Sequence, residues 1–144
     1  MNTARRTLEK YENSLESAPR LKPLCAHNWA STVPREAGVY AIWIKKKPVY
    51  VGQTSSLRAR MADLAMPVNH TFSRKTCEQL GLAETSLEEF SIAVSSKYTL
   101  SFVQVPIGRA ELEEYLVLRW RESLTNKPAA RLLKSPQYSW VVAV

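Results

Sequence analysis

The fold of this chain is decided by residues 38–60, which read GVYAIWIKKKPVYVGQTSSLRAR. Residues 39–44 and 49–52 are rich in β-branched and aromatic side chains, which favours two strands. The basic turn between them predicts that the two strands form a hairpin. Pro48 stands at the start of the second strand, where the missing N–H of proline is tolerated.

The remaining elements follow from hydrophobic spacing. Leu57, Met61 and Leu64 recur at helical intervals directly after the hairpin. We expect helices over 3–17, 54–65 and 107–122, a short helix or turn over 73–82, and strands over 89–94, 99–106 and 138–144. This order predicts an α+β fold, with a small, mainly antiparallel β-sheet flanked by helices.

Length and composition fit one domain. The chain has 144 residues, of which 45% are hydrophobic and 23% are charged, enough for an ordinary buried core. We expect a helical extension over 1–33, a main domain over 34–130, and a C-terminal strand or tail packed on that domain over 131–144. The extension carries an apolar stripe that docks on the core or on a partner.

The charge balance indicates a polyanionic partner. Lys and Arg number 20 against 13 Asp and Glu, a net charge of +7, which favours nucleic acid. No apolar run is long enough to span a bilayer and the charged N-terminus lacks a signal-peptide stretch, so we expect a cytoplasmic protein without a membrane anchor. Cys25 and Cys77 are too few for a disulfide scaffold and we expect them to be reduced.

Charged and phenolic residues of the hairpin region allow two interpretations. The lysines at 45–47 form either a solvated turn or a contact to phosphate. Arg58 and Arg60 are two positions apart on a helix, so they point in roughly opposite directions and at most one faces a given site. Tyr40 and Tyr50 are either core aromatics or two phenols that converge on a substrate.

The long C-terminal helix carries three glutamates near its start. Glu114 shares one side of this helix with Val117 and Leu118, so we expect it to be partly buried, and such a carboxylate usually has a partner or a metal. Glu111 and Glu113 look more exposed. Alternatively, all three glutamates are solvated and interact favourably with the helix dipole.

Five residues form an ordered pattern along the chain. GVY ends at Tyr40, YVG begins ten residues later at Tyr50, and Arg60 follows after another ten. Glu114 then precedes Asn126 by twelve residues, and Asn126 opens an NKP turn. This pattern resembles the GIY-YIG nuclease superfamily, whose members carry an arginine at this place and a metal-binding glutamate followed by an asparagine.

The resemblance implies a metal-dependent DNA endonuclease that hydrolyses phosphodiester bonds. Tyr40 would orient or deprotonate the attacking water, although its ordinary pKa near 10 must then be lowered by nearby cations. Arg60 would contact the scissile phosphate, and Glu114 would hold Mg²⁺ or Mn²⁺. Tyr50 would position the site by hydrogen bonding, and Asn126 would brace it.

The resemblance covers roughly residues 34–128 and departs from the family at two places. Some members carry a tyrosine or histidine four residues after the arginine, where this chain has Leu64. His70 in the following loop fills this gap as a proton shuttle or phosphate ligand. Some members carry a lysine where this chain has Gln53. Gln53 and Arg58 are candidate residues for substrate binding or for bracing the site.

Three functions therefore stay open. The first is the DNA endonuclease, and the second is the same fold retained for nucleic-acid or protein binding with weak or no catalysis. The third is a basic α+β domain that shares only the hairpin pattern, in which case replacing Tyr40 and Tyr50 by Phe would cost stability alone. With no attached recognition domain, specificity would come from the chain itself, a homodimer or an accessory protein.

Overall fold

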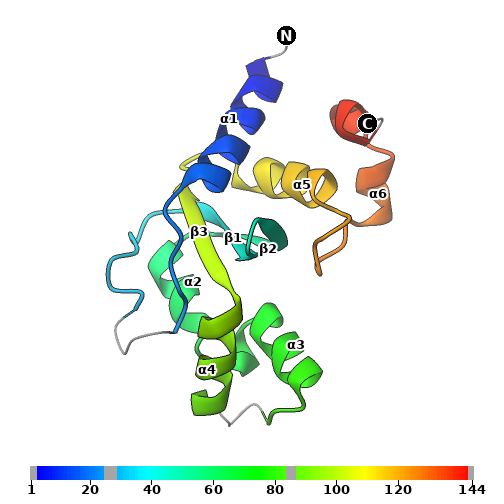
Figure 1. Ribbon diagram of the computed structural model, residues 1–144. Helices are drawn as coiled ribbons and strands as arrows, with labels where there is room; N and C mark the ends of the chain where they lie inside the picture. The colour runs from blue at the N-terminus through cyan, green and yellow to red at the C-terminus, as the bar shows by residue number, and fades with distance from the viewer. Residues whose placement is uncertain (1–2, 25–28, 84–86, 143–144) are drawn as a thin grey trace.

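A small antiparallel sheet forms the centre of the protein (Figure 1). The computed structural model describes residues 3–24, 29–83 and 87–142. Within these ranges the sheet has three strands in the order β2-β1-β3, namely β1 (Gly38–Ile44), β2 (Lys47–Thr54) and β3 (Thr99–Gln104). The predicted α+β class with a small antiparallel sheet is therefore confirmed.

The predicted hairpin is confirmed as the antiparallel pair β1 and β2. Tyr40 pairs directly with Gly52, and Ile42 with Tyr50, before a bulge shifts the register between Ile42 and Trp43. The turn passes through Lys45 at φ 56°. Because β1 is the central strand, almost every one of its side chains is buried.

Helices occupy most of the remaining described chain. They are α1 (Thr3–Ser17), α2 (Leu57–Asp63), α3 (Thr71–Leu80), α4 (Leu87–Lys97), α5 (Arg109–Arg119), α6 (Ala130–Leu133) and α7 (Ser139–Val142), with 3-10 turns η1 (Pro67–Asn69) and η2 (Pro136–Tyr138). The helices predicted over 3–17, 54–65, 73–82 and 107–122 are confirmed as α1, α2, α3 and α5. None of the described helices has the length and apolar content that crossing a membrane requires.

The strand predicted over 89–94 is wrong, because this segment belongs to α4. Its β-branched and aromatic content favours a strand, but its burial follows a helical period. Phe90 and Val94, four residues apart, are buried, whereas Ile92 between them is 64% exposed. Lys97 in the last turn also complements the helix dipole.

The strand predicted over 138–144 is also wrong for the part that the structure describes. Tyr138 closes η2, and Ser139–Val142 forms α7, while residues 143–144 and Cys25 lie outside the described residues. Tyr138 and Val141, three residues apart, are both buried in the cluster around α5. The spacing of the buried side chains is thus helical here too.

The two faces of the sheet carry two separate cores. Val39, Ala41 and Trp43 of β1 pack in a cluster with α1 and α5, whereas Tyr40 and Ile42 pack in a cluster with α2, α3 and α4. In Figure 1, α1 and α5 lie above the sheet, and α2, α3 and α4 lie below it. The alternation of β1 therefore places Tyr40 under the helices that follow the hairpin.

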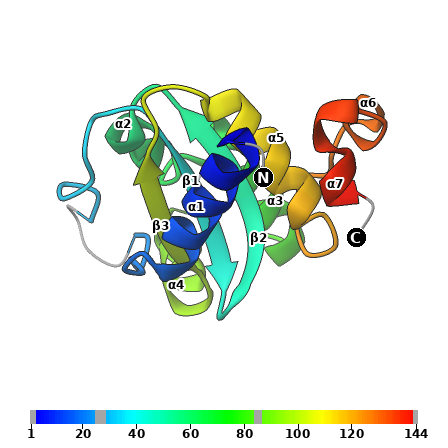
Figure 2. The ribbon, with the colours of Figure 1, turned by 90° about the horizontal axis from the view of Figure 1, so that it is seen from above.

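The N-terminal helix is part of the first core. Figure 2 shows α1 crossing the sheet beside α5. Leu15 is fully buried, and its carbonyl accepts a hydrogen bond of 2.8 Å from the Ser101 hydroxyl of β3. The buried Glu12 carboxylate accepts hydrogen bonds from the Tyr115 hydroxyl and from Arg119 Nε on α5. Of the two docking surfaces expected for this helix, the core is the one that the structure shows.

Candidate active site

Two tyrosines of the hairpin lie side by side below the sheet. The Tyr40 and Tyr50 rings have their centroids 6.2 Å apart, and Tyr40 is 1% exposed. The Tyr40 ring lies across its strand partner Gly52, where an added Cβ would stand 2.5 Å from the phenolic oxygen. The glycine of the YVG sequence is therefore required by the close approach of this ring.

His70, at the N-cap of α3, completes the surroundings of the Tyr40 hydroxyl. Its Nε2 lies 2.8 Å from the Tyr40 oxygen, and its Nδ1 accepts the N–H of Phe72 at 3.1 Å. A nitrogen that accepts carries no proton, so the neutral ring bears its proton on Nε2 and donates it to Tyr40. Burial and then the charge of Arg60 lower the pKa of His70 to about 3, which keeps the ring neutral.

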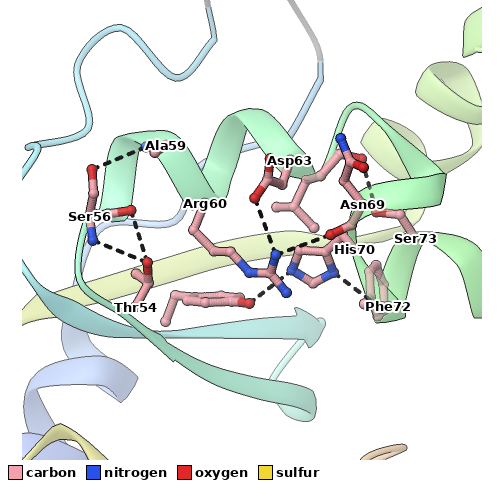
Figure 3. A network of polar contacts seen from close by, with 11 residues as sticks. Thr54, Ser56, Ala59, Arg60, Asp63, Asn69, His70, Phe72 and Ser73 are labelled. Atoms are coloured by element: carbon pink, nitrogen blue, oxygen red, sulfur yellow. Dashed lines mark hydrogen bonds and ion pairs between the residues drawn. The ribbon is translucent and has the colours of Figure 1, made fainter.

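Arg60 of α2 lies over the same hydroxyl groups. Its Nη1 donates to Asp63 Oδ2 at 3.2 Å and to the Asn69 carbonyl at 3.1 Å, and Figure 3 shows its guanidinium beside His70. Burial lowers the pKa of Arg60, but the interactions with Tyr40, Asp63 and Tyr50 together outweigh it, so the net shift of the pKa is upward. A fixed, fully charged guanidinium thus faces the tyrosines.

Arg58 has a different environment from Arg60. Its Nε donates to the Val33 carbonyl at 2.7 Å, in the segment before β1. The two arginines therefore differ in their partners, as their spacing predicts, and only Arg60 contacts the tyrosine pair.

Both tyrosines are phenols at neutral pH. Burial, followed by the neighbouring Tyr50, raises the pKa of Tyr40 above its ordinary value, while Arg60 opposes the shift. Burial also raises the pKa of Tyr50, again against the effect of Arg60. The Tyr40 oxygen accepts from His70 and contacts Arg60, so any negative charge that develops on it is stabilised by two N–H donors.

Glu113 of α5 is the carboxylate whose charge acts on both tyrosines. Its charge raises the pKa of both Tyr40 and Tyr50. Burial raises the pKa of Glu113 itself, a hydrogen bond from the Gln53 backbone N–H lowers it, and neighbouring Glu114 raises it. The sequence-based expectation that Glu113 is exposed is thus wrong. Its position four residues before the buried Val117 is the signal that could have found it.

Glu114, the carboxylate that the family spacing selects, is held by the C-terminal segment. Its Oε2 lies 3.3 Å from Arg131 Nη1, and its Oε1 accepts the Tyr138 hydroxyl at 3.2 Å. Both carboxylate oxygens therefore have protein partners, on the side of α5 that faces α6 and η2. Glu114 still lines a cavity of about 390 Å³ together with Glu113 and Gln53.

Asn126 lines the same cavity and fastens the loop after α5 to the outer edge of β2. Its Oδ1 accepts the Val51 N–H at 3.4 Å, and its Nδ2 donates to the Val51 carbonyl at 2.7 Å. Val51 is the residue between Tyr50 and Gly52. Asn126 therefore holds the strand that carries the second tyrosine.

The side chains of this site could hold a metal ion only if a bound substrate or water supplied further ligands. Among the described residues, no three histidine, cysteine or carboxylate side chains are grouped closely enough to hold a metal on their own. Mg²⁺ is commonly held by one or two carboxylates together with substrate phosphates and water. A carboxylate of α5, Glu113 first and Glu114 second, fits this kind of site.

Comparison with protein-family models, curated proteins and solved structures gives no significant match. The function is therefore argued from the site. The structure brings Tyr40, Tyr50, Arg60 and His70 together from β1, β2, α2 and the N-cap of α3. It pairs Glu114 instead with Arg131 and Tyr138.

Proposed function

We propose that this protein is a metal-dependent DNA endonuclease with an active site of the GIY-YIG type. The observation that carries the proposal is the cluster of Tyr40, Tyr50, Arg60 and His70, which come from four separate parts of the chain. If these four positions only formed part of the hydrophobic core, apolar side chains would fill them equally well. A half-buried arginine that contacts two phenols instead suits a ligand that develops negative charge.

Each residue of this cluster has a task in phosphodiester hydrolysis. Arg60, held by Asp63 and by the Asn69 carbonyl, binds the scissile phosphate and stabilises the charge that builds up on it. Tyr40 orients the attacking water and takes its proton when it reacts as phenolate. His70 donates to the Tyr40 oxygen and so favours that phenolate. Its role is to position Tyr40, in place of the proton shuttle or phosphate ligand that the sequence suggests.

The carboxylates of α5 are the candidates for holding Mg²⁺ or Mn²⁺. Glu113 is the stronger candidate because its charge acts on both tyrosines, and because burial leaves that charge in need of a cation. Glu114 is the second candidate, since Arg131 already compensates its charge. A bound divalent cation supplies charge neutralisation at the phosphate and at the leaving oxygen.

Plasmid nicking by matched tyrosine variants tests the proposal. Supercoiled plasmid is incubated in Mg²⁺ or Mn²⁺ with wild type, Tyr40→Phe or Tyr98→Phe. Tyr98 is a buried tyrosine of the same core for which no hydroxyl hydrogen bond is formed with described residues, so it controls for the loss of a phenol. We expect Tyr40→Phe to lose about 100-fold or more in rate and Tyr98→Phe to keep it. Equal nicking by all three proteins would overturn the proposal.

A binding module without catalysis is the second candidate function. The observation that favours it is Leu64, which is 3% exposed and packs in the core where some family members carry a polar catalytic side chain. DNA binding that persists in EDTA, with no nicking in either metal, would support this function. If Tyr40→Phe only lowered stability and no DNA were bound, the hairpin pattern alone would be shared.

A further inference from the structure

A second cavity lies at the other end of β2. It has a volume of about 520 Å³ and is lined by Lys47 of the hairpin and by Arg119, Trp120 and Arg121 at the end of α5. The catalytic proposal uses none of these residues. We call this feature the basic cleft.

The charge of the basic cleft is strongly positive. Three cations line it against one carboxylate, Glu122. Arg121 donates from Nη1 to the Leu118 carbonyl at 2.6 Å, which places its charge at the C-terminus of α5. Arg119 forms an ion pair with Glu12. Lys47 comes from the hairpin instead, and within the described chain its ammonium has neither an ion pair nor a hydrogen bond.

The basic cleft also has an aromatic wall. Trp120 is partly exposed and packs edge-on against Trp43, with ring centroids 5.3 Å apart. The far side of this pair is fixed, because the Arg20 guanidinium lies 3.8 Å from the Trp43 ring centroid. Cations beside a supported aromatic ring are the combination that binds the backbone and bases of a nucleic-acid strand.

The basic cleft and the cavity beside Glu113 are joined by one continuous edge. The loop after α5 follows the outer edge of β2, where the Ser123 hydroxyl donates to the Pro48 carbonyl at 2.6 Å and the Thr125 N–H donates to the Val49 carbonyl at 2.8 Å. Asn126 continues this pairing to Val51. Pro48 and Gln53 are five residues apart on β2, so the two cavities are separated by about 17 Å.

We propose that the basic cleft is a second DNA-binding site, which holds the DNA backbone beside the outer edge of β2, away from the scissile phosphate. Lys47 and Arg121 contact phosphates there, and Trp120 stacks on a base where the strand is unpaired. The proposal rests on the DNA endonuclease function above and adds a site that fixes where the DNA lies. It also gives the lysine-rich hairpin turn a role beyond solvation.

Binding in EDTA tests the basic cleft without any need for cleavage. The dissociation constant of a fluorescein-labelled duplex, and of the same strand alone, is measured by fluorescence anisotropy over a range of salt concentrations. The variants are Lys47→Gln, Lys47→Gln/Arg121→Gln, and a control, Lys10→Gln/Lys22→Gln. The control removes two exposed lysines that lie away from both cavities. Among the described residues, the single variant removes no ion pair or side-chain hydrogen bond, so it guards against misfolding of the double variant.

We expect the double variant to weaken binding about tenfold and to lower the salt-dependence slope by about 2, because each phosphate contact contributes about 0.9. The single variant should lower the slope by about 1, and the control should leave it within error. Unchanged slopes, an equal loss in the control, or no DNA binding by wild type would overturn the proposal.

The two proposals fail separately. If the protein nicks plasmid but its DNA affinity does not depend on Lys47 and Arg121, the nuclease proposal stands and the proposal for the basic cleft is rejected. If the protein binds DNA through the basic cleft but does not nick plasmid, the proposal for the basic cleft stands and the nuclease proposal is rejected.

Discussion

The Tyr40 hydroxyl and the His70 ring form a buried pair, with 2.8 Å between the phenolic oxygen and Nε2. Because the Phe72 N–H donates to Nδ1, protonation of His70 would break this N-cap hydrogen bond, although Nε2 could still donate to Tyr40. The ordinary pKa of histidine in an unfolded chain is near 6.5, and in the folded protein it is lowered to about 3. Protonation of His70 is therefore coupled to unfolding.

This coupling predicts acid sensitivity. Between these two pKa values the unfolded chain binds a proton that the folded protein does not, so stability is complete above about pH 6.5 and falls as the pH falls. The loss contributed by His70 reaches about 3 kcal/mol near pH 4. Urea unfolding of wild type at several pH values measures it.

The matched variant is His70→Asn, because asparagine keeps an acceptor at the N-cap of α3 and does not titrate. We expect its stability at neutral pH to be lower, and its decline between pH 6.5 and pH 4 to be shallower than that of wild type. Parallel pH curves for the two proteins would show that His70 is protonated in the folded state.

The pH dependence of nicking distinguishes Tyr40 from His70 as the base. The pKa of Tyr40 lies above its ordinary value near 10, so its phenolate fraction rises about tenfold for each pH unit across the neutral range. If Tyr40 takes the proton from water, the nicking rate should rise with pH from 6 to 9. A base with the pKa of His70 would already be deprotonated there, so a flat profile would contradict the assignment to Tyr40.

Two neighbouring glutamates give opposite predictions for metal dependence. Glu113→Gln should abolish nicking, or should raise the Mn²⁺ concentration needed for half-maximal rate about tenfold or more. Glu114→Gln should mainly weaken the contacts with Arg131 and Tyr138, leaving the metal requirement near that of wild type. Titration of Mn²⁺ against nicking rate measures both variants, and the reverse ranking would return the role to the residue that the family spacing selects.

Local sequence predicted the hairpin and α5, because both rest on short-range patterns. The strands of the hairpin are rich in β-branched and aromatic residues on both sides of a basic turn. In α5, Leu112, Tyr115 and Leu116 recur at helical spacing, and all three are buried. The strand predicted over 89–94 is wrong because the strand propensity of its residues and the helical spacing of its buried side chains disagree. Packing of Phe90 and Val94 in one core decides for the helix.

Long-range packing explains why the site was only partly predictable. The convergence of Tyr40, Tyr50 and Arg60 follows from the hairpin and the helix after it. The choice between Glu113 and Glu114 depends on the rotation of α5 against β2 and on Arg131, which lies far along the sequence. Spacing within α5 places both glutamates near buried residues, Glu113 four residues before Val117 and Glu114 four before Leu118, so it does not choose between them.

Gly52 should tolerate no side chain. A Cβ there would lie 2.5 Å from the Tyr40 oxygen and 2.6 Å from the nearest carbon of its ring, so Gly52→Ala must displace the tyrosine. We expect a loss of about 1–3 kcal/mol in unfolding free energy, together with loss of nicking. Gly81→Ala is the control, because Gly81 has φ 67° but no atom within 4 Å of an added Cβ, and it should lower stability without changing nicking per folded molecule. Full activity in Gly52→Ala would show that the Tyr40 ring can move without cost.

The contact between α1 and α5 predicts that the N-terminal helix is required for stability. Glu12 is 6% exposed and joins Tyr115 and Arg119, so Glu12→Ala leaves a buried hydroxyl and a guanidinium without their partner. We expect a loss of about 2–4 kcal/mol in unfolding free energy, measured by urea denaturation. Glu9→Ala is the matched control on the same helix, because its ion pair with Arg5 is largely in solvent and contributes less than about 1 kcal/mol. Equal, small losses in both variants would mean that α1 is an appendage whose docking adds little to the stability of the fold.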